Sequence, residues 1–152
     1  QPKTWIAVTA IDGAEAPAKS PAPRLVQLRN LARDFTVQMT NDGKPWELRL
    51  LPQPIYRYSA PDAGVLDGGL FAYVWTRGTD PECLLRLECC DEPSGLRWQY
   101  SLIRFTTREL RATLRDREVW KSPAGGNWIR GPSQDPYAVF YAGRVSVPAD
   151  KP

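Results

Sequence analysis

The stretch RLVQLRNLARDFTVQMTNDGKPWELRL, residues 24–50, carries two different hydrophobic periods in succession. Over residues 24–34 the apolar side chains fall on one stripe of a helix: Leu25, Leu28, Leu31 and Ala32. Arg24 and the other polar residues of this segment are expected on the remaining faces. From residue 35 onward the period changes to two, which is typical of a strand with one buried face. The stretch therefore predicts an amphipathic helix that leads directly into a sheet.

The second half of this stretch predicts a β-hairpin. Residues 35–40 and 46–50 alternate between apolar and polar side chains, and the Asn-Asp-Gly-Lys-Pro segment at 41–45 is a turn signal between them. The expected buried face of the hairpin is formed by Phe35, Val37, Met39, Trp46, Leu48 and Leu50.

The remainder of the chain is expected to form short strands separated by turns and loops. Pro52 and Pro54 interrupt the next segment, so residues 55–58 are expected to form an edge strand or the start of a new strand. Residues 59–64 are expected to form a loop. The further expected strands are 70–75, 84–90, 96–105, 110–115, 118–120 and 137–141, with a tight turn at 116–117.

One helix followed by about seven strands at meander spacing, without a second helix between them, argues against parallel βαβ units. The sequence thus predicts an α+β fold, in which one N-terminal helix packs on a strongly curved, mainly antiparallel sheet. A closed or nearly closed β-barrel is the alternative architecture.

The domain organisation follows from length and proline content. A chain of 152 residues suffices for one domain with a single core. Residues 1–23 form a Pro/Ala-rich segment with a possible short strand at 4–9, residues 24–147 form the domain, and residues 148–152 form a frayed tail. Ser20 followed by proline also suits the start of a helix.

The composition excludes several classes of catalytic site. The chain contains no histidine, so it lacks a Ser-His-Asp triad, a Cys-His pair and any histidine-ligated zinc site. Its net charge is +3, and fifteen of its twenty basic residues are arginines. A charge of this size, scattered along the chain, is not the electrostatic signature of a nucleic-acid-binding protein.

The three cysteines lie close together in sequence, at positions 83, 89 and 90. On a strand, Cys83 and Cys89 are about 20 Å apart, whereas a disulfide needs Cα atoms within about 7 Å. Cys89 and Cys90 point to opposite faces. All three are therefore expected to be reduced and mostly buried, and neither a metal site nor a cofactor is expected.

Three segments resemble a pattern that recurs in uncharacterised bacterial proteins, many of them exported: LLPQPIYRY at 50–58, DGGLFAYV at 67–74 and GTDPE at 78–82. The resemblance covers about residues 24–120 and implies one intact domain outside the cytoplasm, in the periplasm or cell envelope. It implies no activity and no catalytic residue. The Ala/Pro-rich start of the chain at Gln1 favours the same location.

The favoured function is that of a non-catalytic binding or structural module of the bacterial envelope. A curved sheet under a helix leaves an apolar hollow, which suits a hydrophobic small molecule or a segment of another envelope protein. Strand parity places seven aromatic residues in its lining: Tyr56, Tyr58, Phe71, Tyr73, Trp75, Trp98 and Tyr100.

Two alternative functions make different structural predictions. A carboxylate-dependent hydrolase would use the loop carboxylates Asp67, Asp80 and Glu82, which should then converge beside a cleft with raised pKa values. A nucleic-acid-binding domain would present Arg104, Arg111 and Arg115 on one exposed face.

Overall fold

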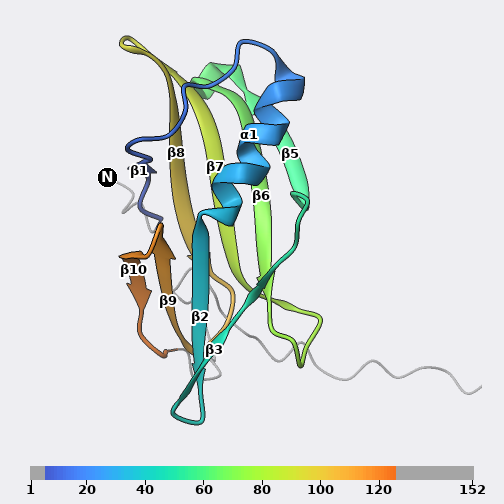
Figure 1. Cartoon of the computed structure of the whole chain (residues 1–152), viewed down its shortest axis with the longest axis vertical. Coiled ribbons are helices and arrows are strands. Elements are labelled where there is room, and N and C mark those ends of the chain that lie inside the picture. Colours follow the sequence, from blue (N-terminus) through green and yellow to red (C-terminus); the bar gives the residue numbers. More distant parts are fainter. Residues whose placement is uncertain (1–5, 126–152) are drawn as a thin grey trace, which may run out of the picture.

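Two antiparallel β-sheets and one α-helix surround a common hydrophobic core (Figure 1). The computed structural model describes residues 6–125. The helix is α1 (Pro21–Arg33), and a short 3₁₀ turn, η1, spans Pro61–Ala63. The strands are β1 (Thr9–Ala10), β2 (Phe35–Asn41), β3 (Lys44–Glu47), β4 (Arg49–Leu50), β5 (Tyr56–Ala60), β6 (Val65–Val74), β7 (Pro81–Glu92), β8 (Gly95–Arg104), β9 (Glu109–Leu114) and β10 (Arg117–Ser122).

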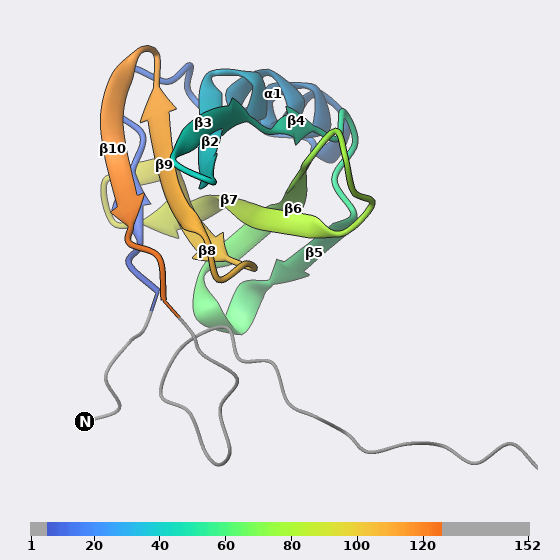
Figure 2. The same cartoon turned by 90° about the horizontal axis from the view of Figure 1, so that it is seen from below.

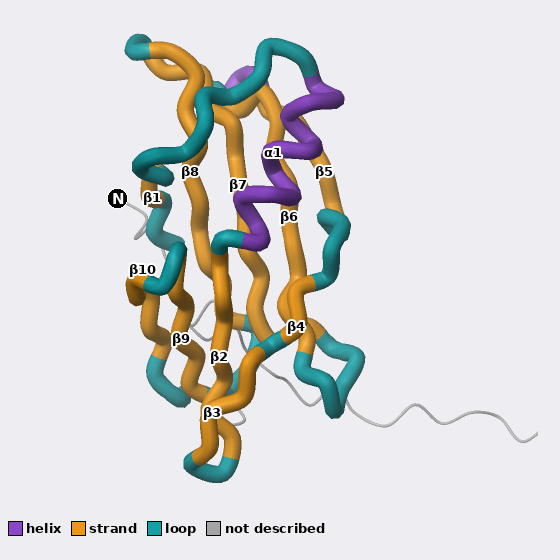
Figure 3. The backbone as a smooth tube through the Cα atoms, viewed as in Figure 1, coloured by secondary structure: helices purple, strands orange, loops and turns teal. Residues whose placement is uncertain are grey.

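The larger sheet has the order β1-β8-β7-β6-β4, and β5 also pairs with β6. β4 and β5 follow the same edge of β6, separated by the proline-containing segment (Figure 3). Hydrogen bonds from Leu51 N to Ala72 O (2.9 Å) and from Ile55 N to Leu70 O (2.7 Å) hold this segment against β6. The predicted edge strand is therefore confirmed, because its prolines interrupt a strand that needs partners on one side alone.

The smaller sheet has the order β10-β9-β2-β3. β2 and β3 form the predicted hairpin, and its turn contains Asp42 and Gly43 with φ values of 50° and 72°, as a two-residue type I′ turn requires. The second arm of the hairpin divides at Leu48, whose N–H still donates to Val37 O at 2.8 Å. The next residues, in β4, pair with β6 of the larger sheet instead. This crossing joins the two sheets and leaves a seam between β2 and β4.

The core lies between the larger sheet on one side and α1 with the smaller sheet on the other (Figure 2). Leu28 and Ala32 of α1 are fully buried and Leu31 is 7 % exposed, as the helical stripe predicted, whereas its fourth member, Leu25, is half-buried. Val37 and Met39 are fully buried on the inner face of β2. Truncation of a fully buried leucine to alanine costs about 2–5 kcal/mol, so α1 is anchored mainly by these contacts.

The expectation that Arg24 lies on an outer face of the helix is wrong, because Arg24 is buried, with 6 % exposure. The helix begins at Pro21, with Ser20 at the N-cap, so residues 21–23 belong to α1. In this extra turn the Arg24 guanidinium reaches the carbonyl oxygens of Ala18 and Lys19 at 3.0 and 2.9 Å. A carboxylate of the larger sheet, described below, completes its set of partners.

Several expected boundaries are wrong by a few residues. The expected loop at 59–64 contains the end of β5 and η1, and β6 begins at Val65, five residues before the predicted strand. The tight turn before β10 lies at Arg115 and Asp116, with φ values of 49° and 64°. Of the expected strand at 4–9, the structure shows β1 at 9–10, and the predicted strand at 137–141 and the tail lie outside the described residues.

The predicted α+β class is confirmed, with one helix on a strongly curled antiparallel sheet that forms a half-barrel. The second sheet was not expected, and it raises the number of strands in residues 6–125 to ten. The described helix is too short and too polar to cross a bilayer.

Candidate functional site

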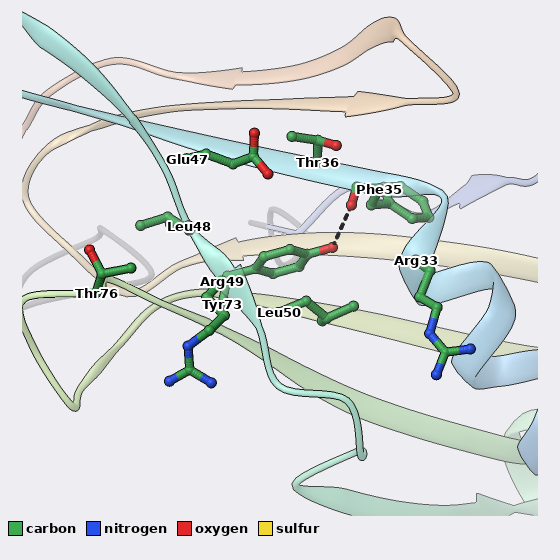
Figure 4. Close-up of a pocket in the computed structure, with 9 residues that line it drawn as sticks. All are labelled: Arg33, Phe35, Thr36, Glu47, Leu48, Arg49, Leu50, Tyr73 and Thr76. Atoms are coloured by element: carbon green, nitrogen blue, oxygen red, sulfur yellow. Dashed lines mark hydrogen bonds between the residues drawn. The ribbon is translucent and has the colours of Figure 1, made fainter.

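A cleft of about 470 Å³ opens at the seam where β2 and β4 diverge (Figure 4). We call it the seam cleft. It is lined by residues from the end of α1, from β2, from the β3–β4 crossing and from β6: Arg33, Phe35, Thr36, Glu47, Leu48, Arg49, Leu50, Tyr73 and Thr76. Its volume falls within the range of about 300–1,000 Å³ that is typical of small-molecule sites.

The floor of the seam cleft is aromatic and aliphatic. Tyr73 is 1 % exposed, and its ring lies in the gap between the two strands beside Leu50 (Figure 4). Its hydroxyl lies 3.2 Å from Ala32 O at the end of α1 and 3.1 Å from Phe35 O at the start of β2, and its single proton is shared between these two acceptors. Burial, followed by the neighbouring Cys83, raises the pKa of Tyr73. Tyr73 is therefore a fixed neutral side chain and not a proton-transfer group.

The rim of the seam cleft carries two arginines, Arg33 and Arg49. Arg33 donates to Asn30 Oδ1 at 3.3 Å, and within residues 6–125 neither Arg33 nor Arg49 forms an ion pair. Both guanidinium groups are exposed, and Figure 4 shows Leu50 between them. Glu47 points to the opposite side, toward Thr36 (Figure 4). Two arginines and one glutamate give the lining a formal charge of +1.

The seven aromatic residues predicted to line a hollow do not gather in one place. Tyr73 lines the seam cleft. Phe71, Trp98 and Tyr100 belong to the core with exposures of 0, 2 and 7 %. The other three lie at or outside the margins of the core: Tyr56, Tyr58 and Trp75.

Trp75 follows β6 and closes one end of the core. Its ring meets that of Trp46 edge-on, with centroids 6.0 Å apart. The guanidinium of Arg77 lies 4.8 Å from the Trp46 ring, and that of Arg108 lies 5.3 Å from the Trp75 ring. Stacked arginines of this kind shield indole rings from water and stabilise a turn by about 0.5–1 kcal/mol each.

Asp67 is a structural anion in a buried ion-pair network. It is 4 % exposed, and it accepts hydrogen bonds from Arg24 Nε at 3.0 Å and from Arg57 Nε and Nη2 at 2.9 and 2.7 Å. Burial alone would raise the pKa of Asp67, but the hydrogen bonds and charges of Arg57 and Arg24 outweigh it and hold this pKa below its usual range. An open cleft of about 450 Å³ borders the network. A general acid needs the opposite shift.

The other two candidate carboxylates lie at the far end of the larger sheet. Asp80 is exposed in the turn before β7, and Glu82 Oε1 lies 3.6 Å from Arg108 Nη1. Asp67 pairs with Cys89, which is seven residues from Glu82 along β7. At about 3.3 Å per residue this separation is about 23 Å. The structure therefore does not bring the three carboxylates together, and the hydrolase alternative gains no support from it.

The three arginines of the nucleic-acid alternative do not share an exposed face. Arg104 is 8 % exposed and donates to a backbone carbonyl at 2.7 Å. Arg111 lies 3.3 Å from Glu109, and Arg115 lies 2.9 Å from Asp34. Ion pairs with neighbouring carboxylates leave little positive field for a phosphate backbone.

The cysteines are free and buried, as predicted. Cys83 and Cys89 face the core at 0 % exposure, and Cys90 faces outward at 8 %. Burial raises the pKa of Cys83 to about 12. Burial, followed by the charge of Glu88, raises that of Cys90 to about 11. Within residues 6–125, no cluster of three or more cysteine and carboxylate side chains is placed to hold a metal ion.

Arg33 and Arg49 are the site residues that the sequence analysis missed. In sequence both belong to polar faces, one of a helix and one of a strand, which is ordinary for arginine. The feature that distinguishes them is the shared rim, together with the lack of an acidic partner in the described part of the chain. Neither property is visible without the tertiary structure.

No protein-family model matches the chain, and comparisons with curated proteins and with solved structures also give no match. The likeness to exported bacterial proteins thus stays a prediction, and the function has to be argued from the geometry of the chain itself.

Proposed function

We propose that the protein is a non-catalytic binding module, which holds the carboxylate head and the first carbons of an alkyl-chain acid in the seam cleft. The observation that carries this proposal is the pairing of an apolar floor with two rim arginines that have no acidic partner in residues 6–125. An amphipathic anion matches both parts, because its chain covers the floor while its head meets the guanidinium groups.

The charge of the cleft favours a monoanion. The lining carries a formal charge of +1, with Glu47 turned away from Arg49 (Figure 4). Guanidinium groups bind carboxylates through paired hydrogen bonds of fixed geometry. At the end of α1, Ala32 O accepts from the Tyr73 hydroxyl, and Arg33 in the last turn offsets the negative end of the helix dipole.

We further propose that this binding takes place in the bacterial envelope, outside the cytoplasm. The Ala/Pro-rich start of the chain and the resemblance to exported proteins support this location. The burial of all three thiols also suits it, because a buried neutral thiol resists oxidation. Fractionation of cells that express the full-length protein tests the location.

Displacement of a fluorescent fatty acid, dansyl-undecanoate, tests the ligand class. Decanoate should displace the probe, and decanol, which lacks the charge, should compete far more weakly. Each exposed guanidinium contributes about 1 kcal/mol, so Arg33→Gln and Arg49→Gln should each weaken decanoate about fivefold, and the double variant roughly 25-fold.

Arg117→Gln is the matched control, because Arg117 is an exposed arginine of β10 outside the cleft. It should bind decanoate like the parent protein. Equal competition by decanol and decanoate, or equal losses in the control and in the rim variants, would overturn the proposal.

A further inference from the structure

A second surface with the chemistry of a binding site lies on the outer face of the larger sheet, the face turned away from α1. Four residues in register cross four neighbouring strands there: Tyr58 of β5, Gly68 of β6, Glu88 of β7 and Gln99 of β8. Side chains directly opposite one another in a sheet share a face and lie within contact distance. The row is thus set by strand register and not by loop conformation.

Gly68 is what allows the Tyr58 ring to lie against the sheet. A Cβ atom at position 68 would lie 2.5 Å from Tyr58 Cζ and below 3.0 Å from both Cε atoms. No side chain fits under the ring at that distance. The Tyr58 hydroxyl extends past the glycine and donates to Glu88 Oε1 at 2.6 Å. The ring is therefore fixed at its base by the backbone of β6 and at its tip by a carboxylate.

Tyr56 extends this aromatic surface. It lies on the same face two residues earlier, its ring is within 16° of parallel to that of Tyr58, and the centroids are 5.7 Å apart. Tyr56 is 62 % exposed, the largest value among the exposed large hydrophobic residues of the described chain. The fixed Tyr58 and the more exposed Tyr56 stacked against it form an aromatic platform with a hydroxyl group at the tip of each ring.

Polar groups border the platform on the side of β7 and β8. Gln99 Nε2 donates to Glu88 Oε2 at 2.9 Å, and within residues 6–125 the amide oxygen of Gln99 has no hydrogen-bond donor. In the next row Arg86 Nη2 donates to Ser101 Oγ at 3.0 Å, while its buried Nε has no hydrogen-bond partner in the described part of the chain. Arg86 Nε and Glu88 Oε1 are 3.7 Å apart, so these two charges neutralise each other.

We propose that this tyrosine platform, formed by Tyr56 and Tyr58 with Arg86, Glu88 and Gln99, binds a neutral oligosaccharide. The apolar C–H faces of a pyranose ring fit against parallel aromatic rings. Its hydroxyl groups both donate and accept, which matches the half-buried amide of Gln99 and guanidinium of Arg86, while the buried Glu88 holds Tyr58 and Gln99 in place. The paired charges of Arg86 and Glu88 favour a ligand without net charge over an anion or a cation.

The platform is separate from the seam cleft and shares no residue with it. Glu88 holds its position through two hydrogen bonds before any ligand arrives, and the pKa of Tyr58 is raised by burial and by its bond to Glu88. Both side chains are therefore held in place by hydrogen bonds before binding, which lowers the cost of ordering them when a ligand binds.

Amide chemical-shift titration of the full chain with cellohexaose, chitohexaose and maltohexaose tests this inference. At least one hexaose at millimolar concentration should shift the amide signals of residues 56–59, 68–69 and 86–88 together. Tyr56→Ala should weaken the binding about fivefold to tenfold, because half of the aromatic surface is lost.

Val26→Ala is the control, because Val26 is 53 % exposed on α1, on the other side of the larger sheet. It should leave the titration unchanged. The inference is overturned if none of the three sugars shifts the platform signals, if Tyr56→Ala and Val26→Ala bind alike, or if the shifts cluster around Arg33 and Arg49 instead.

Discussion

Replacement of Asp67 by asparagine should destabilise the fold, because Asp67 links three segments that are distant in sequence. Its two oxygens accept three hydrogen bonds from Arg24 and Arg57. The same guanidinium groups continue to the carbonyl oxygens of Ala18, Lys19 and Pro21, at 2.6–3.0 Å. The carboxylate thus holds the segment before α1, the first turn of α1 and β5 against β6.

The magnitude follows from burial. Removal of one partner of a buried ion pair costs about 3–5 kcal/mol, since the other charge is left without compensation. Here the side chain of Arg24 is 8 % exposed, that of Arg57 is 32 % exposed, and asparagine still offers one acceptor oxygen. We therefore expect Asp67→Asn to lower the free energy of unfolding by about 2–3 kcal/mol.

Urea unfolding at neutral pH measures this loss as a lower midpoint with an unchanged slope. Asp62→Asn, at an exposed position in η1, is the control and should change stability by less than about 0.5 kcal/mol. The folded pKa of Asp67 lies below its unfolded value of about 3.9, so its stabilisation is complete above that value and disappears as the pH falls through the folded pKa. The gap between parent and Asp67→Asn should therefore close in acid. A negligible gap at neutral pH, or one that persists in acid, refutes the reasoning.

Three further predictions concern packing and chemistry. Gly68→Ala should lower the free energy of unfolding by about 1–3 kcal/mol, because the new Cβ would strike the Tyr58 ring. Nearly all of this cost should disappear in a Tyr58→Ala background, where the ring is absent. Equal costs in both backgrounds would contradict the packing of the ring on Gly68. Asp116 has a φ of 64° in the β9–β10 turn, a backbone conformation that glycine adopts without steric cost. Asp116→Gly should therefore raise the free energy of unfolding by up to about 1 kcal/mol, and a lower urea midpoint would count against this. Burial raises the pKa of Cys83 to about 12 and that of Cys90 to about 11. Neither thiol should therefore react with a thiol reagent at pH 8 until urea unfolds the protein. Rapid labelling of the native protein would contradict this.

The hydrophobic periods of residues 24–50 predicted the helix and the first hairpin correctly, because both depend on neighbours in the chain. They could not predict the crossing at Leu48. The alternation continues without a break from residue 46 to 50, while the hydrogen-bond partner changes from β2 to β6. A period of two specifies which face is buried but not which strand is adjacent.

Arg24 shows the same limit for a polar residue. Its position on the helix pattern predicts exposure, and its burial depends on Asp67, 43 residues later in the chain. A pairing over that distance leaves no local signal.

The candidate site could be predicted only in part. Strand parity predicts that Tyr73 faces inward, whereas Arg33 and Arg49 become a site only when α1 and β4 meet across the seam.

The most direct test of the proposed function is a crystal structure of the full chain grown with decanoate. We predict the carboxylate between the guanidinium groups of Arg33 and Arg49, with the alkyl chain over Tyr73 and Leu50. A seam cleft that stays empty at saturating decanoate, or a ligand bound elsewhere on the protein, would contradict the account.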